Sequence, residues 1–265
     1  MELLKNKTAV IYGATGAIGR AVAIAFAEAG CSLYLTGRNP NEMDKLIKEI
    51  TKHGGKAEGD QVDATDEVAV NDHLEKVVNK TGKIDISFNA IGIPQTGVQG
   101  IPLMQLTAEG YTTPVVTYMR SHFITATAAA RQMSSKKSGV IITLTAVPSK
   151  LAAPLVGGMA PSWAGIEALT RTIAAEVGSL GIRAVCLRAD GMPETDTITT
   201  VFGLHAKGAG MPSHKEFQSL MESFTILKRL PKLSELADTA VFIASNKASA
   251  ITGTTINVTC GSVID

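Results

Sequence analysis

Gly13-Ala14-Thr15-Gly16-Ala17-Ile18-Gly19 is the stretch of sequence that decides the fold. It follows the short apolar run Thr8-Ala9-Val10-Ile11-Tyr12 and precedes residues 17–29, in which apolar side chains recur at helical spacing. Glycines between a strand and a helix let the backbone turn sharply and approach a pyrophosphate, whose charge meets the free N–H groups at the helix start. A tight turn without a ligand would give the same pattern, but the strand before it and the helix after it favour a dinucleotide site.

Strands and helices alternate along the rest of the chain. The expected strands lie near residues 33–36, 56–62, 84–88, 140–145, 182–188 and 254–258. The expected helices lie near residues 41–53, 66–80, 115–134, 161–179 and 234–245. Seven strands with helical crossovers predict an α/β fold with a doubly wound, seven-stranded parallel sheet of the Rossmann type. No linker rich in Pro, Ser or charge interrupts residues 1–265, so we predict a single domain.

Two segments fall outside this alternation. Residues 92–106 and residues 191–225 are rich in glycine and proline and read as loops. Loops this long are usually lids or binding loops, and less often disordered. Both follow the carboxyl end of an expected strand, the edge where open α/β sheets bind ligands. We therefore predict a lid or substrate loop at 191–225, and its apolar side chains suggest an apolar small-molecule ligand.

Composition and charge exclude several classes of protein. The 265 residues are 45% hydrophobic and 18% charged, which is typical of a globular chain. A net charge of +1 without a basic run argues against nucleic acid or an anionic membrane surface as a partner. No apolar run is long enough to span a membrane, and the N-terminal segment is too short and polar for a signal peptide. Three widely separated cysteines, and histidines without ligand spacing, predict no metal and a reducing, cytoplasmic location.

Thr36-Gly37-Arg38-Asn39 follows the second expected strand, where a dinucleotide site selects the adenosine ribose. An acidic residue there would accept hydrogen bonds from the 2′-hydroxyl of NAD. Instead, Gly37 leaves room and Arg38 offers a planar, permanently charged group suited to a 2′-phosphate. A solvated surface arginine is the competing interpretation, but the position favours NADP(H) as the cofactor.

Two further strand ends supply candidate cofactor contacts. Asp63, in Val62-Asp63-Ala64, could meet the adenine amino group, although a helix N-cap role nearby is the alternative. The small residues of Asn89-Ala90-Ile91-Gly92 would admit a ribose against the sheet edge. The complete set of candidate cofactor-binding residues is Gly13, Thr15, Gly16, Ile18, Gly19, Arg38, Asn39, Asp63, Ala64, Asn89, Ala90 and Gly92.

Together these motifs resemble the short-chain dehydrogenase/reductase family, and the resemblance covers nearly the whole chain. The glycine loop, Asp63, residues 89–92 and Ile251-Thr252-Gly253-Thr254-Thr255-Ile256-Asn257-Val258 occur in the family's order, and Gly261 fits as well. The resemblance implies a single NAD(P)-binding domain, hydride transfer to or from a carbonyl or an alcohol, and frequent tetramers.

The resemblance also implies where the proton chemistry belongs, and there this sequence departs from the family. The family uses a tyrosine whose pKa is lowered by a lysine, a serine that polarises the carbonyl, and an asparagine that supports the proton relay. The tyrosine and lysine positions fall on Met159 and Trp163. The serine position falls on Ala146, and the asparagine position falls near Tyr118. The family's proline-glycine turn near the nicotinamide is replaced by Ala189-Asp190-Gly191.

No shift of register restores the missing pair, because none of the four tyrosines is followed four residues later by lysine. Met159 has no proton to give, and the indole N–H of Trp163 is neither acidic nor cationic. Losing a general acid typically costs about 10²–10⁴-fold in rate, and losing an oxyanion donor costs about 10²–10³-fold. We therefore expect a degenerate active site with weak or absent turnover.

Other residues are weaker candidates for the lost chemistry. Tyr118 is the best alternative acid, although a packed core or interface tyrosine is the simpler interpretation. Ser149-Lys150 could approach a substrate or form part of a surface loop, and His122 reads as an interface or core side chain.

Three hypotheses follow from the sequence. The chain binds NADP(H) with little or no redox turnover, or it is an active NADP-dependent reductase of ketones or enones with a relocated donor such as Tyr118. Alternatively, it has lost the cofactor too, because Trp163 occupies the space of the nicotinamide ribose. The small residues of the expected helices 115–134 and 161–179 predict a homo-oligomer, a dimer or a tetramer, although interior packing explains them equally well.

Overall fold

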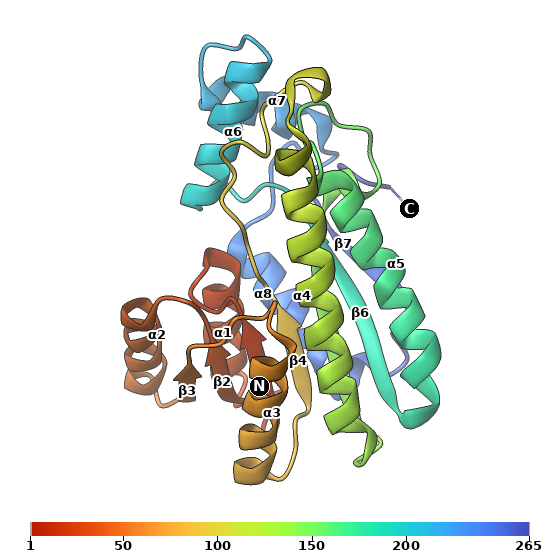
Figure 1. The fold of residues 1–265 in the computed structure, drawn as a ribbon. Coiled ribbons are helices and arrows are strands. Elements are labelled where there is room, and N and C mark those ends of the chain that lie inside the picture. The colour runs from red at the N-terminus through yellow and green to blue at the C-terminus, as the bar shows by residue number, and fades with distance from the viewer. Residues whose placement is uncertain (1, 265) are drawn as a thin grey trace.

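Seven strands form one parallel sheet in the structure, a computed structural model that describes residues 2–264. The strands are β1 (Thr8–Tyr12), β2 (Ser32–Thr36), β3 (Lys56–Asp60), β4 (Ile86–Asn89), β5 (Gly139–Ala146), β6 (Ile182–Ala189) and β7 (Thr254–Val258). Their order is β3-β2-β1-β4-β5-β6-β7, and every neighbouring pair is parallel (Figure 1). From β1 to β3 the strands are added toward one edge of the sheet, and from β4 to β7 they are added toward the other edge. The point between β1 and β4 where this order reverses is where open sheets of this kind bind ligands. The predicted fold class is confirmed.

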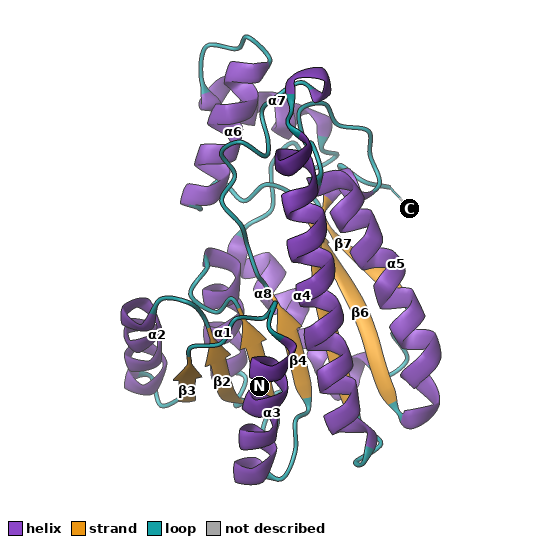
Figure 2. Ribbon diagram, viewed as in Figure 1, coloured by secondary structure: helices purple, strands orange, loops and turns teal. Residues whose placement is uncertain are grey.

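Helices cover both faces of the sheet (Figure 2). One face packs against α1 (Ala17–Glu28), α2 (Pro40–Lys52) and α8 (Leu233–Ala244), and the other against α3 (Glu67–Thr81), α4 (Ala108–Ser134) and α5 (Met159–Val177). Because successive strand side chains point to opposite faces, Ile11 joins the first core and Val10 the second. Both faces are therefore apolar, which is why the strands read as continuous apolar runs.

Residues 191–225 are largely helical, so the prediction of a loop there is wrong for most of this stretch. They form α6 (Asp196–Gly208) and α7 (His214–Phe224), which lie beyond the carboxyl ends of the strands (Figure 1). The loop was predicted from the glycines of this segment, which do not all break a helix. Gly203 lies inside α6 and faces open space, and only Gly210, at φ +69°, lies past the end of that helix. The Thr195 and Ser213 side chains cap the two helices, and this capping was the signal that the sequence analysis overlooked.

Two of the helices that border the site begin earlier than predicted. The helix expected from residue 115 begins at Ala108, because Pro114 is accommodated inside α4. The helix expected from 161 begins at Met159. Gly158 lets these two helix starts meet, since a Cβ there would overlap the Tyr111 carbonyl oxygen. Residues 92–106 form an irregular segment with one short 3-10 turn (Leu103–Gln105), as predicted.

Candidate functional site

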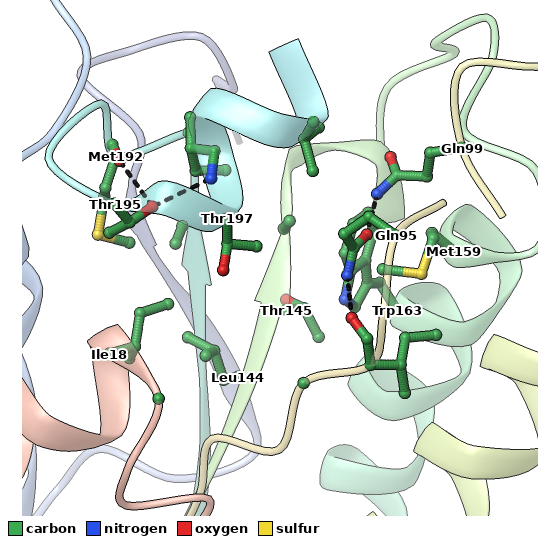
Figure 3. A pocket seen from close by; sticks show the side chains of 18 of the residues that line it. Ile18, Gln95, Gln99, Leu144, Thr145, Met159, Trp163, Met192, Thr195 and Thr197 are labelled. Carbon is green, nitrogen blue, oxygen red and sulfur yellow. Dashed lines mark hydrogen bonds between the residues drawn. The ribbon is translucent and has the colours of Figure 1, made fainter. Parts of the chain in front are cut away.

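A cavity of about 1260 Å³ lies at the carboxyl ends of β1, β2, β4, β5 and β6 and is roofed by α6 and α7 (Figure 3). It runs from the glycine loop at Gly13 to Phe224 at the end of α7. All the candidate cofactor-binding residues except Gly19, and all four residues at the expected catalytic positions, line it. The topology therefore brings together residues that are up to 150 positions apart in the chain, from Gly13 to Trp163.

The glycine loop has the geometry that a pyrophosphate site requires. Gly13 has φ +71°, and a Cβ there would lie 2.7 Å from the Ala90 carbonyl oxygen. A Cβ on Gly19 would overlap the Gly13 carbonyl oxygen, so Gly19 supports the loop from behind instead of lining the cavity. Gly16 is the N-cap of α1 and supplies no side-chain cap, and the first turn holds no acid, which leaves the N–H groups of this helix start open toward the cavity. The residues present therefore fit an anionic dinucleotide bridge.

The end of β2 is crowded at residue 37, where any side chain would have to displace its neighbours. Gly37 is buried, and a Cβ on it would lie 3.1 Å from the Thr15 hydroxyl oxygen and 3.0 Å from Met43 Cε. Arg38 follows as an exposed side chain on the cavity rim. Asn39 also lines the cavity, but its Oδ1 caps α2 by accepting from the N–H groups of Asn41 and Glu42, at 3.1 and 3.3 Å. Only its amide nitrogen is left for a ligand.

Asp63 and Asn89 shape the two adjacent strand ends. Asp63 Oδ1 accepts from the backbone N–H and the hydroxyl of Thr65, at 2.8 and 2.7 Å, and these hydrogen bonds hold the pKa of its carboxyl below the ordinary value. The N-cap of α3 is Asp66, so Asp63 does not serve as that cap. Asn89 accepts from Ile91 N–H and donates to the Thr125 hydroxyl, both at 3.0 Å. These bonds fix the chain as it leaves β4.

The chemical end of the cavity holds the four residues that the sequence analysis aligned with the family's catalytic positions. Ala146 ends β5, Met159 begins α5, Trp163 follows one turn later, and Tyr118 comes from α4. Met159, Trp163 and Tyr118 pack into one apolar cluster that borders the cavity. Trp163 is half-buried against this cluster, and the cavity extends from the glycine loop to α6 and α7. Burial raises the pKa of Tyr118 to about 12, partly offset by a backbone hydrogen bond from Ile93.

The altered turn after β6 carries a half-buried carboxyl group that lines the cavity. Asp190 Oδ1 accepts from Gly191 N–H at 2.7 Å, and Oδ2 accepts from the Ser262 hydroxyl at 2.6 Å. Burial raises the pKa of Asp190 above its ordinary value. Both carboxyl oxygens are thus occupied in joining the turn to the C-terminal segment.

Comparison with known proteins identifies the family. A family model described as enoyl-(acyl carrier protein) reductase matches residues 13–262. The chain belongs to the short-chain dehydrogenase/reductase family. It is 29% identical over 98% of its length to the uncharacterized oxidoreductase YxbG of Bacillus subtilis (strain 168), covering 92% of that protein. It is 29% identical to a probable 2,4-dienoyl-CoA reductase of the same organism, and 28% identical to the 3-oxoacyl-[acyl-carrier-protein] reductase FabG of Chlamydia pneumoniae; each match covers 97% of both chains.

Solved structures of the family share this fold closely. The structure of NAD⁺-bound xylitol dehydrogenase matches 97% of this chain with a TM-score of 0.92 at 24% identity, covering 99% of that protein. A 7α-hydroxysteroid dehydrogenase complexed with NADH and 7-oxo glycochenodeoxycholic acid matches all of this chain and 97% of that one, with a TM-score of 0.85 at 27% identity. The chain described in this structure is thus an oxidoreductase of the short-chain dehydrogenase/reductase type by fold and family.

Several polar residues of this family member were missed by the sequence analysis. Gln95 and Gln99 from the segment after β4, and His205 from α6, line the cavity and bond to one another. The sequence shows only that these polar residues lie in two otherwise apolar segments, residues 92–106 and 191–225. Which of them form hydrogen bonds with each other depends on the tertiary structure. Ser149, weighed as a substrate contact, instead donates to Glu167 Oε1 and accepts from Arg188 Nε, so it belongs to a buried ion-pair cluster.

Two expected absences concern membranes and metals. Within residues 2–264, no helix is both long and apolar enough to cross a bilayer. The same residues contain no group of three or more His, Cys, Asp or Glu side chains placed to hold a metal ion. His122 is a buried core residue of α4 that bonds through Nδ1 to the Tyr118 carbonyl oxygen at 3.0 Å.

Proposed function

We propose that this protein binds NADP(H) and performs the family's carbonyl/alcohol redox reaction weakly or not at all. One observation carries the proposal: a cavity suited to a dinucleotide reaches a chemical end lined by Ala146, Met159 and Trp163. None of these three side chains can hand a proton to an alkoxide.

The glycine loop and the rim at Arg38 support the cofactor half of this proposal. The open start of α1 would receive the pyrophosphate, and Asn89 and Ala90 would border the nicotinamide-side ribose. The lack of an acidic side chain at Gly37 and the charge of Arg38 favour a 2′-phosphate. Among similar solved structures, a gluconate 5-dehydrogenase from Burkholderia cenocepacia J2315 is in complex with NADP, whereas the 7α-hydroxysteroid dehydrogenase holds NADH. The preference for NADP(H) therefore rests on Gly37 and Arg38 of this chain.

The missing proton donor supports the catalytic half. NADPH, when bound, supplies a hydride, and reduction of a ketone then requires a proton at the new alkoxide oxygen. The Tyr118 phenol packs in one apolar cluster with Met159 and Trp163, but a pKa of about 12 makes it a poor acid near neutral pH. Ala146 offers no hydroxyl to polarise the carbonyl. The positions expected to hold these groups thus offer neither a carbonyl-polarising hydroxyl nor a proton donor for ketone reduction.

The second candidate function is an active NADP-dependent reductase of ketones or enones, and enone reduction needs the missing groups least. The matching family model is described as an enoyl-(acyl carrier protein) reductase, and one relative as a probable 2,4-dienoyl-CoA reductase. Reduction of a conjugated C=C bond protonates a carbon, which solvent can supply. Such a reaction would depend less on the lost serine, tyrosine and lysine.

We also propose that the protein is a cytoplasmic homo-oligomer, a dimer or tetramer, with an apolar small molecule as its further ligand. The apolar side chains of α6 and α7 that line the cavity support the ligand, and exposed Val116 and Phe123 on α4 support a subunit contact. Neither nucleic acid nor a membrane is expected as a partner, given a net charge of +1. Sedimentation velocity of the wild type and of Phe123→Glu would test the contact.

The decisive experiment for the function uses Trp163, the only tryptophan of the chain, as an internal probe. NADPH should quench its emission at lower concentration than NADH does. NADPH-loaded protein mixed with ketones should consume no NADPH, whereas enones distinguish the second candidate. Enone turnover that Tyr118→Phe abolishes would favour a relocated donor, and unchanged emission at millimolar NADPH would contradict cofactor binding.

A further inference from the structure

Three buried polar side chains in the cavity wall form a continuous hydrogen-bonded chain, and Figure 3 shows two of them, Gln95 and Gln99, near Trp163. Gln95 Nε2 donates to the Ile93 carbonyl oxygen at 2.5 Å, and Gln99 Nε2 donates to Gln95 Oε1 at 2.5 Å. His205 Nε2 lies 3.2 Å from Gln99 Oε1. Gln95, Gln99 and His205, the polar array, are only 9%, 4% and 8% exposed. Buried polar groups cost stability unless they are bonded, so an array of this kind in an apolar wall indicates a use.

The direction of the array fixes the position of its protons. The Ile93 carbonyl can only accept, so Gln95 must donate to it with its amide nitrogen and accept with Oε1. Gln99 then donates to Gln95 and accepts with its own Oε1, so His205 must donate through Nε2. A neutral imidazole that carries its hydrogen on Nε2 has a bare lone pair on Nδ1. Burial lowers the pKa of His205, which favours this neutral form.

The array keeps hydrogen-bonding capacity that faces the cavity. Among residues 2–264, no group bonds to His205 Nδ1, yet this atom is not one of the fully enclosed side-chain atoms that lack a partner. Nδ1 is therefore accessible, and His205 lines the cavity. Each glutamine amide also has a second N–H beyond the one used within the array. The wall thus offers one acceptor next to amide donors.

The array is held rigidly between two segments. A Cβ on Gly100 would lie 2.6 Å from the Leu204 carbonyl oxygen, and a Cβ on Gly208 would overlap the Gly100 carbonyl oxygen. The loop that carries Gln99 therefore packs directly against the backbone of α6, which carries His205. Such contact preorganises the polar groups, because neither segment can shift independently.

We propose that the polar array recognises a hydroxyl group on an otherwise apolar substrate. The substrate O–H would donate to His205 Nδ1, and its oxygen would accept from a free amide N–H of Gln99 or Gln95. A carbonyl or ether oxygen can only accept, so it would leave Nδ1 unpaired, and a carboxylate would be repelled by the Nδ1 lone pair. Phe202, Phe217, Leu220 and Met221 would contact the apolar body. This inference rests on the proposed function, because it assigns the glycine-loop half of the cavity to the cofactor.

Binding of three matched probes tests the proposal: cyclooctanol, cyclooctanone and cyclooctyl methyl ether. The affinities are measured by calorimetric titration of the full chain in the presence of NADPH. Because the cofactor is supplied in its reduced form, it cannot oxidise the alcohol. The wild type should bind cyclooctanol about tenfold more tightly than the ketone or the ether, the fold-change of one hydrogen bond. Gln99→Leu and His205→Phe should abolish this preference. Phe217→Leu, the matched control on the apolar wall, should weaken all three probes alike and keep the preference.

Equal affinities in the wild type, no binding of any probe, or a preference that survives His205→Phe would overturn the proposal. A measurement on the wild type covers the case in which the variants do not fold. Long-range ¹⁵N NMR should show His205 protonated at Nε2, with its Nδ1 resonance shifted by cyclooctanol but not by the ether; a spectrum that stays unchanged contradicts the proposal. NADPH binding is measured separately, so a chain that selects the alcohol without binding NADPH would refute the proposed function and leave the array standing.

Discussion

Arg188 and Glu167 form a two-point ion pair next to the chemical end of the cavity. Arg188 Nε lies 2.9 Å from Glu167 Oε1, and Nη2 lies 2.7 Å from Oε2. Both residues are buried, one on β6 and the other on α5. Thr145, which lines the cavity, donates to Glu167 Oε1 at 3.0 Å. The pair therefore joins the sheet, the helix that carries Met159 and Trp163, and the wall of the site.

Removing one partner of this pair should destabilise the fold strongly, because it leaves the other charge buried without compensation. Arg188→Met should lower the free energy of unfolding by about 3–5 kcal/mol, and the double variant Arg188→Met, Glu167→Leu should recover much of that loss. Urea unfolding of the wild type and the three variants forms a double-mutant cycle. Additive effects of the two substitutions would show that the pair does not act as a unit.

Acid should destabilise the fold through His122, which is buried in α4. Its Nδ1 bonds to the Tyr118 carbonyl oxygen, so the hydrogen is on Nδ1, and Nε2 is buried without a partner. Burial lowers the pKa of His122 to about 4 from an ordinary 6.5. As pH falls from 6.5 to 4, this histidine is protonated in the unfolded chain but stays neutral in the folded chain. The free energy of unfolding therefore drops by about 3 kcal/mol. This contribution is fully present above pH 6.5.

The pH dependence of urea unfolding checks this prediction. His122→Leu should flatten the profile between pH 4 and 6.5, whereas the exposed His53→Leu serves as the matched control and should retain the slope. An unchanged slope in His122→Leu would assign the acid sensitivity to other groups.

Arg38 should decide the choice between NADPH and NADH. Arg38→Ala removes the cation at the end of β2 and should weaken NADPH binding about tenfold while leaving NADH binding within about twofold. Arg120→Ala is the control: this arginine donates to the Thr65 carbonyl oxygen near Asp63 and should matter equally little for both nucleotides. Quenching of Trp163 emission measures all four affinities. Parallel losses for NADPH and NADH would argue against a 2′-phosphate contact.

The sequence predicted the parts of the molecule whose signals are local. The run from Thr8 to Ile18 contains a buried strand, a glycine turn and a helix start within a dozen residues, and each is formed as expected. The doubly wound parallel sheet was also predicted, because strands joined by helical crossovers leave few alternatives. The alignment of Ala146, Met159 and Trp163 with one wall of a cavity needed only the register of one strand and one helix.

The remainder depends on packing between distant segments. Gln99 and His205 are 106 residues apart, and no local pattern relates them. Glu167 and Arg188 lie on elements that read as apolar, and only the fold shows that the two charges neutralise each other. The glycines in α6 and just after it made two capped helices difficult to predict, since a glycine that ends a helix and one that faces open space look the same in sequence.

The proposed function requires that the cavity binds the dinucleotide but cannot protonate an alkoxide. A single experiment tests both requirements. Trp163 emission first reports the binding of NADPH, and absorbance at 340 nm then follows the consumption of NADPH after each ketone of a panel is added. We predict saturable quenching by NADPH followed by a flat absorbance trace, at the rate of a protein-free sample. Rapid loss of absorbance with any ketone would contradict the account.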